Sequence, residues 1–281
     1  MAILIAESGS TKTNWVYIKS AKSQQHFSTA GMNPFFCSEA DYERILNEEL
    51  AISSKNEVEA IHFYGAGIKD AEKAQIVKKA LKARFKISNI VAHSDILAAA
   101  RATCSSEKGI TCILGTGSNS AYFNGNKIAK QNPSLGYIVG DEGSGTYLGK
   151  KVLQYYFYNT FDDELKEAFL NTYGDNLVHI LDKIYKSPFP NKYLASFTEF
   201  LINYRGHYMV ENIIEDALVE FHQKHVLKYR ESWKYPVHFV GSIAFAFQDI
   251  IKDLHKQYGI ETGKIVKKPI DGLIKHHIAN P

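Results

Sequence analysis

The sequence predicts an α/β protein that consists of two similar domains. Strands that end in glycine turns alternate with helices, which is the pattern of α/β architecture. A strand–turn–strand unit rich in glycine and hydroxyl residues occurs near the N-terminus and again about 108 residues later. That separation indicates a duplicated domain, because solenoid repeats have periods of roughly 20–50 residues. The length of 281 residues also suits two domains of ordinary size.

The first half of the chain combines four predicted strands with two predicted helices. Short apolar runs bounded by glycine or polar turns predict the strands. Longer segments, in which apolar residues recur every three or four positions or small residues dominate, predict the helices. The strands are expected over Ala2–Ala6, Asn14–Ile18, Ala60–Tyr64 and Asn89–Ala92, and the helices over Ile68–Phe85 and Ile96–Thr103.

The second half begins with the repeated hairpin and then becomes strongly helical. The turn signal Asn124-Gly125-Asn126 closes the hairpin, and one further strand runs into a glycine and a helix. The expected strands are Ile110–Leu114, Ser120–Phe123 and Val237–Val240, and the expected helices are Gly143–Tyr158, Asp162–Tyr173, Leu177–Ile184, Ser196–Asn203, Val210–Tyr229 and about Ile243–Gln257.

The repeat places the domain boundary near residue 108. The first domain would span residues 1–108, and the second would span residues 109–267 and include helical insertions. The C-terminal helix, about residues 268–281, is a candidate to pack back on the first domain. No linker rich in Pro, Gly or Ser separates the halves, so the boundary rests on the repeat alone.

The composition excludes several classes of protein. Apolar residues make up 45% and charged residues 22%, close to a globular average, so a disordered chain is excluded. The 33 Lys+Arg and 30 Asp+Glu are interspersed and give +3, which excludes a dedicated nucleic-acid binder. No apolar run approaches the roughly 20 residues of a membrane span, and the N-terminus reads as a strand rather than a signal peptide. Cys37, Cys104 and Cys112 lack CxxC spacing, which favours buried thiols in a reducing, cytoplasmic setting.

The two hairpin turns, Glu7–Thr13 and Gly115–Asn119, are candidate phosphate-binding loops. Their backbone N–H groups and hydroxyls can approach an anion closely, and Lys12 adds a cation to the first turn. One such turn is compatible with an ordinary hairpin, whereas two equivalent turns favour a polyphosphate ligand. Neither turn is a Walker A loop, and no strand–GxGxxG–helix fingerprint occurs, which argues against P-loop and dinucleotide-binding folds.

A third glycine-rich segment, Leu135–Gly145, contains Asp141 and Glu142 at the predicted start of a helix. Asp141 could cap that helix, or the two carboxylates could face a polyhydroxylated ligand or a metal ion. The four glycines of this segment and its two acids favour the ligand or metal interpretation, because a helix cap needs only one acid.

Asp95 follows one predicted strand and opens a helix, where α/β proteins place ligands and catalytic groups. It is a candidate proton acceptor in phosphoryl transfer, with helix capping as the alternative. The histidines show no metal-ligand spacing, and His276-His277 is expected to be a solvated helix end. The sequence therefore predicts one candidate base and no histidine-based metal site.

These residues resemble the N-acetylglucosamine kinase-like branch of the actin/hexokinase/Hsp70 superfamily, which shares a domain with the BadF-BadG-BcrA-BcrD activator ATPases. The resemblance runs nearly end to end and is most specific in GTGSN at 115–119 and GDEGSG at 140–145. It implies two ribonuclease H-like, actin-like ATPase domains with an interdomain cleft that binds ATP and closes around a sugar.

The resemblance also implies a role for each motif. Asp95 would accept the proton of the sugar's primary hydroxyl, and Glu7 would meet Mg²⁺, usually through water. The two hairpin turns and a strand–glycine–helix junction would contact the nucleotide, and other segments would contact the sugar. The implied nucleotide residues are Gly9, Ser10, Thr11, Lys12, Thr13, Thr116, Gly117, Ser118, Gly241 and Ser242, and the implied sugar residues are Asn33, Asp95, Ser134, Leu135 and Asp141.

The implied activity is an ATP- and Mg²⁺-dependent kinase that phosphorylates the primary hydroxyl of an amino sugar, with N-acetylglucosamine as the leading candidate. The chain departs from the family at Glu7–Thr11, usually Asp-Gly-Gly-Gly-Thr, and at Pro133–Gly136, usually Gly-Gly-Trp-Gly. Three alternatives stay open: a kinase for muramic acid, an anhydro sugar or glucosamine; a BadF-type ATPase that drives a redox partner through an iron–sulfur cluster; and a sugar sensor without turnover. The expected partner is a small-molecule amino sugar, without nucleic acid or membrane, and homodimer formation is left open.

Overall fold

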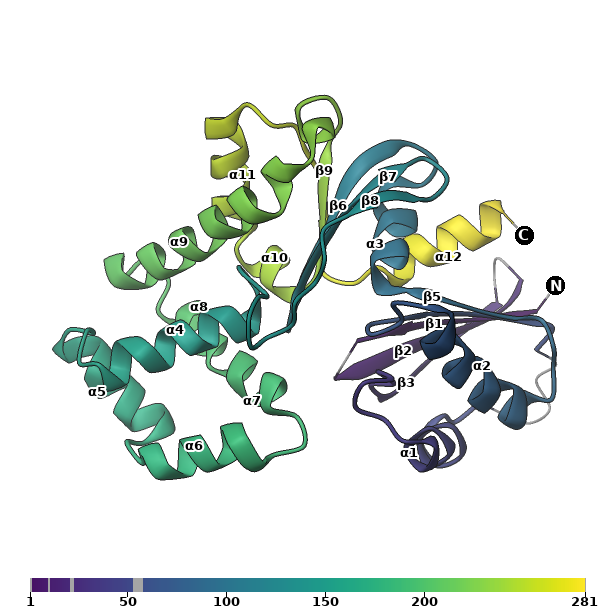
Figure 1. Ribbon diagram of the computed structural model, residues 1–281, viewed down its shortest axis with the longest axis horizontal. Coiled ribbons are helices and arrows are strands. Elements are labelled where there is room, and N and C mark those ends of the chain that lie inside the picture. The colour runs from purple at the N-terminus through teal and green to yellow at the C-terminus, as the bar shows by residue number, and fades with distance from the viewer. Residues whose placement is uncertain (1, 10, 21–22, 53–57, 281) are drawn as a thin grey trace. The chain divides into compact units, whose positions relative to one another are not determined.

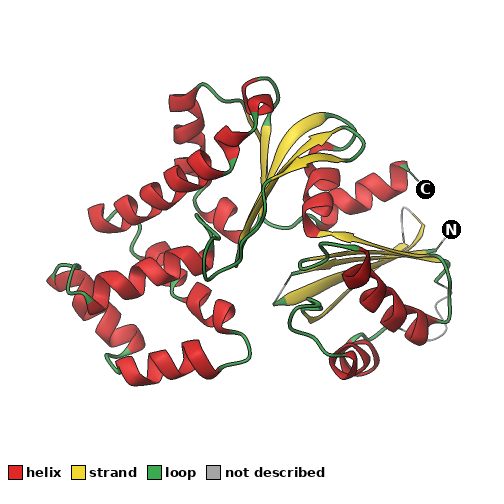
Figure 2. Cartoon of the chain, viewed as in Figure 1, coloured by secondary structure: helices red, strands yellow, loops and turns green. Residues whose placement is uncertain are grey.

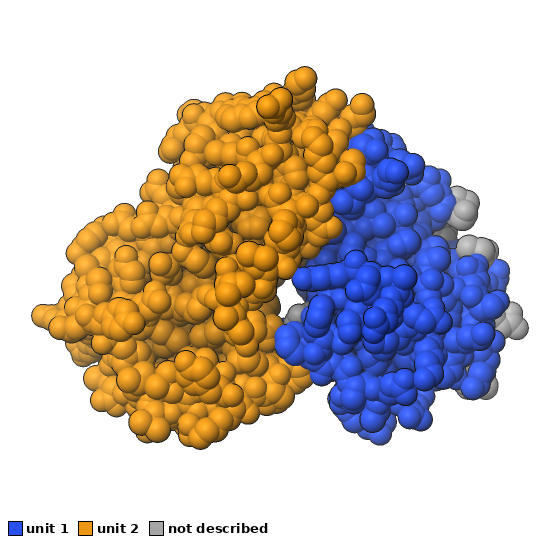
Figure 3. All heavy atoms as spheres, viewed as in Figure 1, with its two compact units in different colours: residues 1–107, 124–128, 268–281 blue, residues 108–123, 129–267 orange. Residues whose placement is uncertain are grey.

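The computed structural model describes residues 2–9, 11–20, 23–52 and 58–280. The chain divides into two units, which Figure 3 shows in different colours. Unit 1 comprises Met1–Glu107, Asn124–Ile128 and Lys268–Pro281, and unit 2 comprises Lys108–Phe123 and Ala129–Lys267. The division between residues 107 and 108 lies one residue before the end expected for the first domain, and the tip of the second hairpin groups with unit 1.

Unit 1 is built on a five-stranded sheet in the order β3-β2-β1-β4-β5 (Figure 1). β1 pairs antiparallel with β2 and parallel with β4, and β4 pairs parallel with β5. The four predicted strands are confirmed, whereas β3 was not predicted, because its polar sequence lacks an apolar run. The strands are β1 Ile3–Ser8, β2 Lys12–Ser20, β3 Ser23–Ala30, β4 Ala60–Gly65 and β5 Ile90–Ser94.

Separate apolar clusters cover the two faces of this sheet, because successive side chains of a strand point to opposite faces. Leu4 and Ala6 pack on the side of α1 and α2, and Ile3 and Ile5 pack on the side of α3 and α12. Both predicted helices are confirmed, and α2 begins at an Asp70 cap. The helices are α1 Glu39–Arg44, the π-turn η1 Ile45–Glu49, α2 Ala71–Phe85, α3 Asp95–Cys104 and α12 Ile270–Ala279.

Unit 2 repeats this topology with a second five-stranded sheet, β10-β9-β6-β7-β8. Numbered along the chain within each unit, both sheets have the strand order 3-2-1-4-5, which confirms the predicted duplication of an α/β unit. β6 pairs parallel with β9, and β9 pairs parallel with β10. The strands are β6 Lys108–Leu114, β7 Ser118–Asn124, β8 Ile128–Gln131, β9 Val237–Val240 and β10 Thr262–Val266.

Helices dominate the remainder of unit 2 (Figure 2). In the described part of the chain no helix is both long and apolar enough to span a membrane. The helical segments are α4 Gly145–Phe157, α5 Asp163–Tyr173, α6 Leu177–Lys186, α7 Pro190–Ser196, α8 Thr198–Asn203, α9 Tyr208–Lys224, the 3₁₀ turns η2 Val226–Lys228 and η3 Arg230–Trp233, α10 Ser242–Ala246 and α11 Gln248–Tyr258.

Two of the predicted helices are wrong in extent. The helix expected over Val210–Tyr229 ends at Lys224, because the side chain of His225 hydrogen-bonds outside the helix and two 3₁₀ turns follow. The helix expected from Ile243 is divided at Phe247, which is fully buried and has non-helical backbone angles. In both places tertiary packing overrides the local apolar period.

An aromatic core joins the helices of unit 2. Phe169 stacks on Tyr156, with ring centroids 3.9 Å apart, and meets the rings of Phe197 and Phe200 at 6.1 Å and 5.8 Å. α4 approaches α7 closely at Gly149, where a Cβ atom would lie 1.8 Å from a backbone carbonyl oxygen of α7. The small residue and the aromatic rings together hold α4, and therefore its N-terminal end, in place.

The C-terminal helix α12 buries a histidine, so the expected solvated helix end is wrong for His277. Its side chain is 5% exposed, its ring centroid lies 4.1 Å from that of His62, and its Nε2 lies 2.9 Å from the hydroxyl of Tyr64. Arg101 donates to the same hydroxyl at 2.6 Å. Burial lowers the pKa of His277 to about 3, with the neighbouring His62 lowering it further.

We expect the buried histidines to make the fold acid-sensitive. Their folded-state pKa values lie below the ordinary 6.5, so the unfolded chain binds more protons below that pH. Stability is therefore fully present above pH 6.5 and is lost as the pH falls, by up to about 1.4 kcal/mol per pH unit for each histidine. The pKa is about 3 for the buried His255 and His277, about 4 for the buried His222 and His238, and about 4 for the partly buried His93.

Urea unfolding between pH 7.5 and pH 4.5 measures this loss. His277→Gln should make the pH dependence of the free energy of unfolding shallower, by up to the slope that uptake of one proton produces. A free energy of unfolding that is constant over this range would contradict the prediction.

Candidate functional site

A buried serine, Ser8, hydrogen-bonds the first hairpin turn to neighbouring segments. The hydroxyl of Ser8 accepts hydrogen bonds from the Thr13 hydroxyl at 2.8 Å and from the Met32 amide at 2.9 Å. The carbonyl of Ser8 accepts from the Ala66 amide at 2.8 Å. Ser8, which stands where the family usually has glycine, therefore ties the turn to the segment after β3 and to the turn after β4.

Thr13 is buried, and Gly9, Thr11 and Lys12, also predicted to contact the nucleotide, form backbone hydrogen bonds around the turn. The Gly9 amide donates to the Lys12 carbonyl at 2.9 Å, and the Gly31 amide donates to the Thr11 carbonyl at 3.2 Å. Thr11 and Lys12 are exposed. Ser10 lies outside the described residues. The described turn thus presents a hydroxyl and an ammonium group to solvent.

Glu7 and Asp95 are neighbouring carboxylates at one edge of the unit 1 sheet. Parallel pairing of β1, β4 and β5 brings the carboxyl ends of all three strands to that edge. Asn14 donates a hydrogen bond to Glu7 Oε2 at 3.0 Å. Burial raises the pKa of Glu7, Asp95 raises it further, and the Asn14 bond and Lys268 lower it only in part. Burial and the neighbouring carboxylate therefore favour the protonated form of Glu7 relative to an exposed glutamate.

Asp95 is the first residue of α3, directly after β5. Its Oδ1 accepts from the Ile96 amide at 2.8 Å, and the N-cap position belongs to Ser94, whose side chain makes no capping bond. A carboxylate in the first helical turn is stabilised by the helix dipole. The alternative of Asp95 as the N-cap is wrong, and the carboxylate is held in a defined orientation at the sheet edge.

Asn33 is buried against the turn that follows β4. Its Oδ1 accepts from the Phe35 amide at 3.0 Å, and its carbonyl accepts from the amides of Phe36 and Cys37. Gly67 has φ +83°, and a Cβ atom there would lie 2.2 Å from Asn33 Oδ1. Because β4 is the neighbour of β5, this contact places Asn33 and Asp95 at the same edge of unit 1.

The second hairpin turn is bonded to the start of α4. The Gly115 amide donates to the Gly117 carbonyl at 3.0 Å and closes the turn. The amides of Gly145 and Thr146 donate to the carbonyls of Gly115 and Thr116 at 2.9 Å and 3.0 Å. These bonds satisfy amides that the first turn of any helix leaves without intrahelical partners. Gly115 and Thr116 are therefore fixed by the start of α4.

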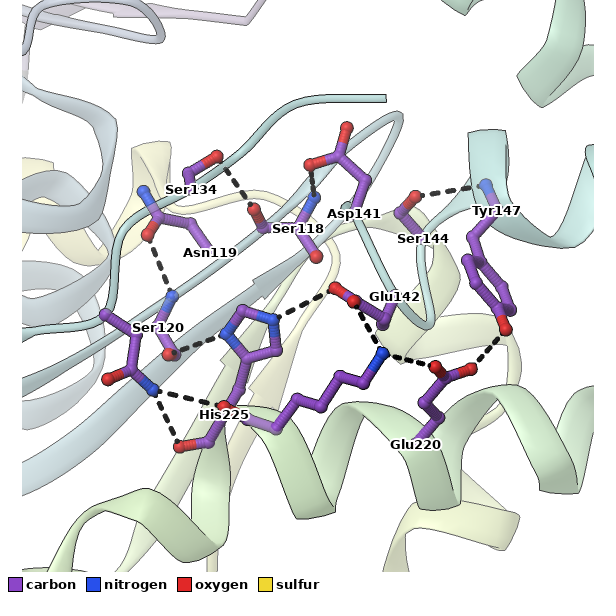
Figure 4. Close-up of polar contacts among 12 residues, drawn as sticks. Ser118, Asn119, Ser120, Ser134, Asp141, Glu142, Ser144, Tyr147, Glu220 and His225 are labelled. Carbon is purple, nitrogen blue, oxygen red and sulfur yellow. Dashed lines mark hydrogen bonds and ion pairs between the residues drawn. The ribbon is translucent and has the colours of Figure 1, made fainter. Parts of the chain in front are cut away.

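Asp141 makes a further link between the same two segments (Figure 4). Its carboxylate accepts from the Ser118 amide at 3.2 Å, and its backbone is left-handed, with φ +63°. A Cβ atom on Gly117 would lie 2.8 Å from Asp141 Oδ2, so this contact requires glycine. The helix begins at Gly145 with Ser144 as its cap, so the interpretation of Asp141 as the cap is wrong.

The main chain of Ser118 binds both ends of the segment before α4. Its amide donates to Asp141, and its carbonyl accepts from the Ser134 hydroxyl at 3.4 Å. Its own hydroxyl is buried and has no hydrogen-bond partner among the residues that the structure describes. Leu135, also predicted to contact the sugar, is 61% exposed. Ser118 therefore contributes to this site chiefly through its backbone.

The predicted junction at Gly241-Ser242 lies beside the second hairpin turn. Gly241 has φ +128°, and a Cβ atom there would lie 2.1 Å from the Leu114 carbonyl oxygen and 3.1 Å from the Gly115 amide nitrogen. Its own amide donates to Val266 at 2.9 Å. Ser242 is exposed at the start of α10. Gly241 is thus needed for the close approach of the β9–α10 turn to the end of β6.

Sequence reasoning missed a charged network around Glu142. Lys224 and His225 contact this carboxylate, although they lie 82 and 83 residues further along the chain. No motif or spacing marks the two residues, because only the packing of α9 against the hairpin brings them near. The three cysteines, all described, form no disulfide, and Cys104 and Cys112 are buried. Among the described residues no group of three or more His, Cys, Asp or Glu could hold a metal ion by itself.

Solved structures resemble the whole chain. A candidate N-acetylglucosamine kinase from Porphyromonas gingivalis is 36% identical, with a TM-score of 0.93 over 99% of each chain. A candidate N-acetylglucosamine kinase from Chromobacterium violaceum is 14% identical, with a TM-score of 0.76 over 98% of each chain. A ROK-family glucokinase from Streptomyces griseus, solved with glucose and AMPPNP, is 16% identical, with a TM-score of 0.58 over 97% of each chain.

The last two structures are similar in fold alone, and together with the first they confirm the predicted fold class. None of the family models searched matches this chain, and no curated protein is significantly similar to it.

We expect Gly117→Ala to displace the Asp141 carboxylate from the Ser118 amide. Loss of this charge-assisted hydrogen bond should lower the free energy of unfolding by about 1.5–3 kcal/mol. Gly115→Ala is the matched control, because a Cβ atom there would meet nothing within 4 Å. Chemical denaturation of the three proteins measures the difference, and equal stability of both variants would contradict the contact.

Proposed function

Because this chain belongs to the N-acetylglucosamine kinase-like branch of the actin/hexokinase/Hsp70 superfamily, we propose that it is an ATP-dependent sugar kinase. Its acceptor is the primary hydroxyl of an amino sugar, and N-acetylglucosamine is the first substrate to test. Family membership follows from 36% identity over 99% of both chains. The observation that best supports kinase chemistry is the pair of carboxylates, Glu7 and Asp95, at the carboxyl edge of β1 and β5.

Asp95 is proposed as the catalytic base. Phosphoryl transfer from ATP to an alcohol needs a group that accepts the hydroxyl proton and otherwise depends on positioning and charge stabilisation. The Ile96 amide holds one oxygen of Asp95, which orients the carboxylate. Asn33, fixed against Gly67 at the same sheet edge, is proposed to hydrogen-bond a sugar hydroxyl near the base.

Glu7 is proposed to contribute to a Mg²⁺ site. Mg²⁺ is usually bound by one or two carboxylates together with waters and substrate phosphates rather than by an all-protein cage. Glu7 and the neighbouring Asp95 supply two carboxyl groups, which fits that donor set. Mg²⁺ held there would neutralise charge on the phosphates of ATP.

The remaining predicted residues are proposed to bind the two substrates. The exposed Thr11 and Lys12 of the first turn suit phosphate oxygens, and the second turn offers its backbone at Thr116–Ser118. Gly241 and Ser242 are proposed to lie at the adenosine. Asp141, with Ser134 and Leu135 on the same segment, is proposed to contact the sugar. The burial of Cys104 and Cys112 supports a kinase over the iron–sulfur alternative.

The function is tested by coupled ADP release with a panel of N-acylated, free-amine and lactyl amino sugars. We expect Asp95→Asn to lower kcat at least about a hundredfold while ATP binding stays within about twofold, because general-base catalysis typically contributes 10²–10⁴-fold. Asp70→Asn is the control, since Asp70 is also a carboxylate at a helix start but caps the distant α2. Unchanged turnover in Asp95→Asn would exclude it as the base.

Glu7→Gln should raise the Mg²⁺ concentration needed for half-maximal activity by about tenfold. The substitution removes a charge next to Asp95 while the contact of Asn14 with a side-chain oxygen can persist. Titration of Mg²⁺ at saturating ATP and sugar measures the shift. The same Mg²⁺ dependence in the variant as in the native enzyme would refute a role for Glu7 at the metal.

A further inference from the structure

We infer that Glu142, held by Lys224 and His225, is a positioning residue that keeps Asp141 and the second hairpin turn in register. The inference rests on the proposed function, because it assigns these two segments to sugar and nucleotide. It concerns contacts within unit 2 only (Figure 4).

The segment around Glu142 is bonded to the second hairpin turn at three points. Asp141 accepts from the Ser118 amide at 3.2 Å, and the amides of Gly145 and Thr146 donate to the turn carbonyls at 2.9 Å and 3.0 Å. A displacement of one segment alone would break all three bonds. The position of the Asp141 carboxylate is therefore coupled to that of the second hairpin turn.

The backbone of this segment needs an anchor. Asp141 has φ +63°, a left-handed conformation that is sparsely populated by residues other than glycine, and Gly143 follows with φ +70°. A residue held in such a region is destabilising and persists only where its surroundings determine it. Glu142 lies between Asp141 and Gly143, so contacts of its side chain can hold the backbone in this conformation.

The side chain of Glu142 is 12% exposed and is held by two residues at the end of α9. Lys224 donates to Oε1 at 3.1 Å, and Nε2 of His225 lies 3.4 Å from Oε2. Burial raises the pKa of Glu142, but hydrogen bonds from its own backbone, Lys224 and His225 outweigh that effect and lower it. Glu142 is therefore ionised at neutral pH and anchored to α9.

His225 extends the anchor to β7. Because the Glu142 carboxylate can only accept, Nε2 bears the proton, and Nδ1 then accepts from the Ser120 hydroxyl at 3.2 Å. Ser120 lies two residues after Ser118 on β7. The network thus joins the GDEGSG segment, the end of α9 and the strand that follows the turn.

The same three residues have the composition of a nucleophile triad, and the structure excludes that role. Ser120 is fully buried, and its hydroxyl also lies 3.1 Å from the hydroxyl of Tyr229. A nucleophile needs an open approach for its substrate, which this oxygen lacks. The serine, histidine and glutamate therefore stabilise the local structure rather than perform covalent chemistry.

Glu220 offers a matched comparison for Glu142. It accepts from the same ammonium group of Lys224 at 2.5 Å and from the hydroxyl of Tyr147, but it belongs to α9 itself and not to the GDEGSG segment. Glu142→Gln and Glu220→Gln each remove one ion pair to Lys224. Only the first variant loosens Asp141 and the hairpin turn.

The test compares the two variants in the full chain by calorimetry with AMPPNP and by sugar-dependent ADP release. Glu142→Gln should weaken AMPPNP binding about tenfold and raise the KM for sugar by a similar factor, whereas Glu220→Gln should stay within about twofold of the native protein. Both should lose similar stability in urea. In the double variant Asp141→Asn/Glu142→Gln, AMPPNP binding should equal that of Asp141→Asn alone, because Glu142 acts through Asp141.

Native AMPPNP affinity in Glu142→Gln, or equal losses in both glutamine variants, would overturn the positioning role. If the native protein binds AMPPNP but turns over no sugar, the kinase proposal fails, and the binding comparison still decides the role of Glu142. Absence of AMPPNP binding in the native protein would contradict both proposals.

Discussion

In each unit the first strand pairs in parallel with the fourth, β1 with β4 and β6 with β9. Parallel strands end at the same edge of a sheet, so the hairpin turn after the first strand lies beside the turn after the fourth. In unit 1 the carbonyl of Ser8 meets the Ala66 amide there, and in unit 2 Gly241 meets the Leu114 carbonyl. Every predicted site residue that the structure describes lies at one of these two edges or on a segment bonded to it.

Close approach at these edges depends on a few glycines. At Gly67 and Gly241 the backbone is left-handed, and a Cβ atom would lie 2.2 Å and 2.1 Å from Asn33 Oδ1 and the Leu114 carbonyl oxygen. At Gly117 the backbone angle is ordinary, and the limit is the Asp141 carboxylate alone. The glycines therefore serve two separate purposes, since some permit a backbone conformation and one leaves room for a side chain.

The pKa values of two glutamates, one in each unit, are shifted in opposite directions. Burial and the neighbouring Asp95 raise the pKa of Glu7, so this carboxyl group holds its proton more tightly than an exposed glutamate does. The pKa of Glu142 is lowered by Lys224 and His225, so its charge is already neutralised by the protein. The first arrangement therefore disfavours a charge on the carboxyl group, whereas the second stabilises one within the protein.

Local apolar periods and turn residues encode the α/β class, the duplication, most strand positions and the three glycine-rich segments, so each of these could be predicted from sequence. The family resemblance also predicted Asp95, Asn33 and Asp141 as site residues. Contacts formed on folding determine that Asp141 binds the Ser118 amide instead of capping α4, that α9 ends at Lys224, and that His277 is buried. Each of these outcomes depends on a partner distant in sequence, and no local pattern of residues specifies which distant segment a side chain will meet.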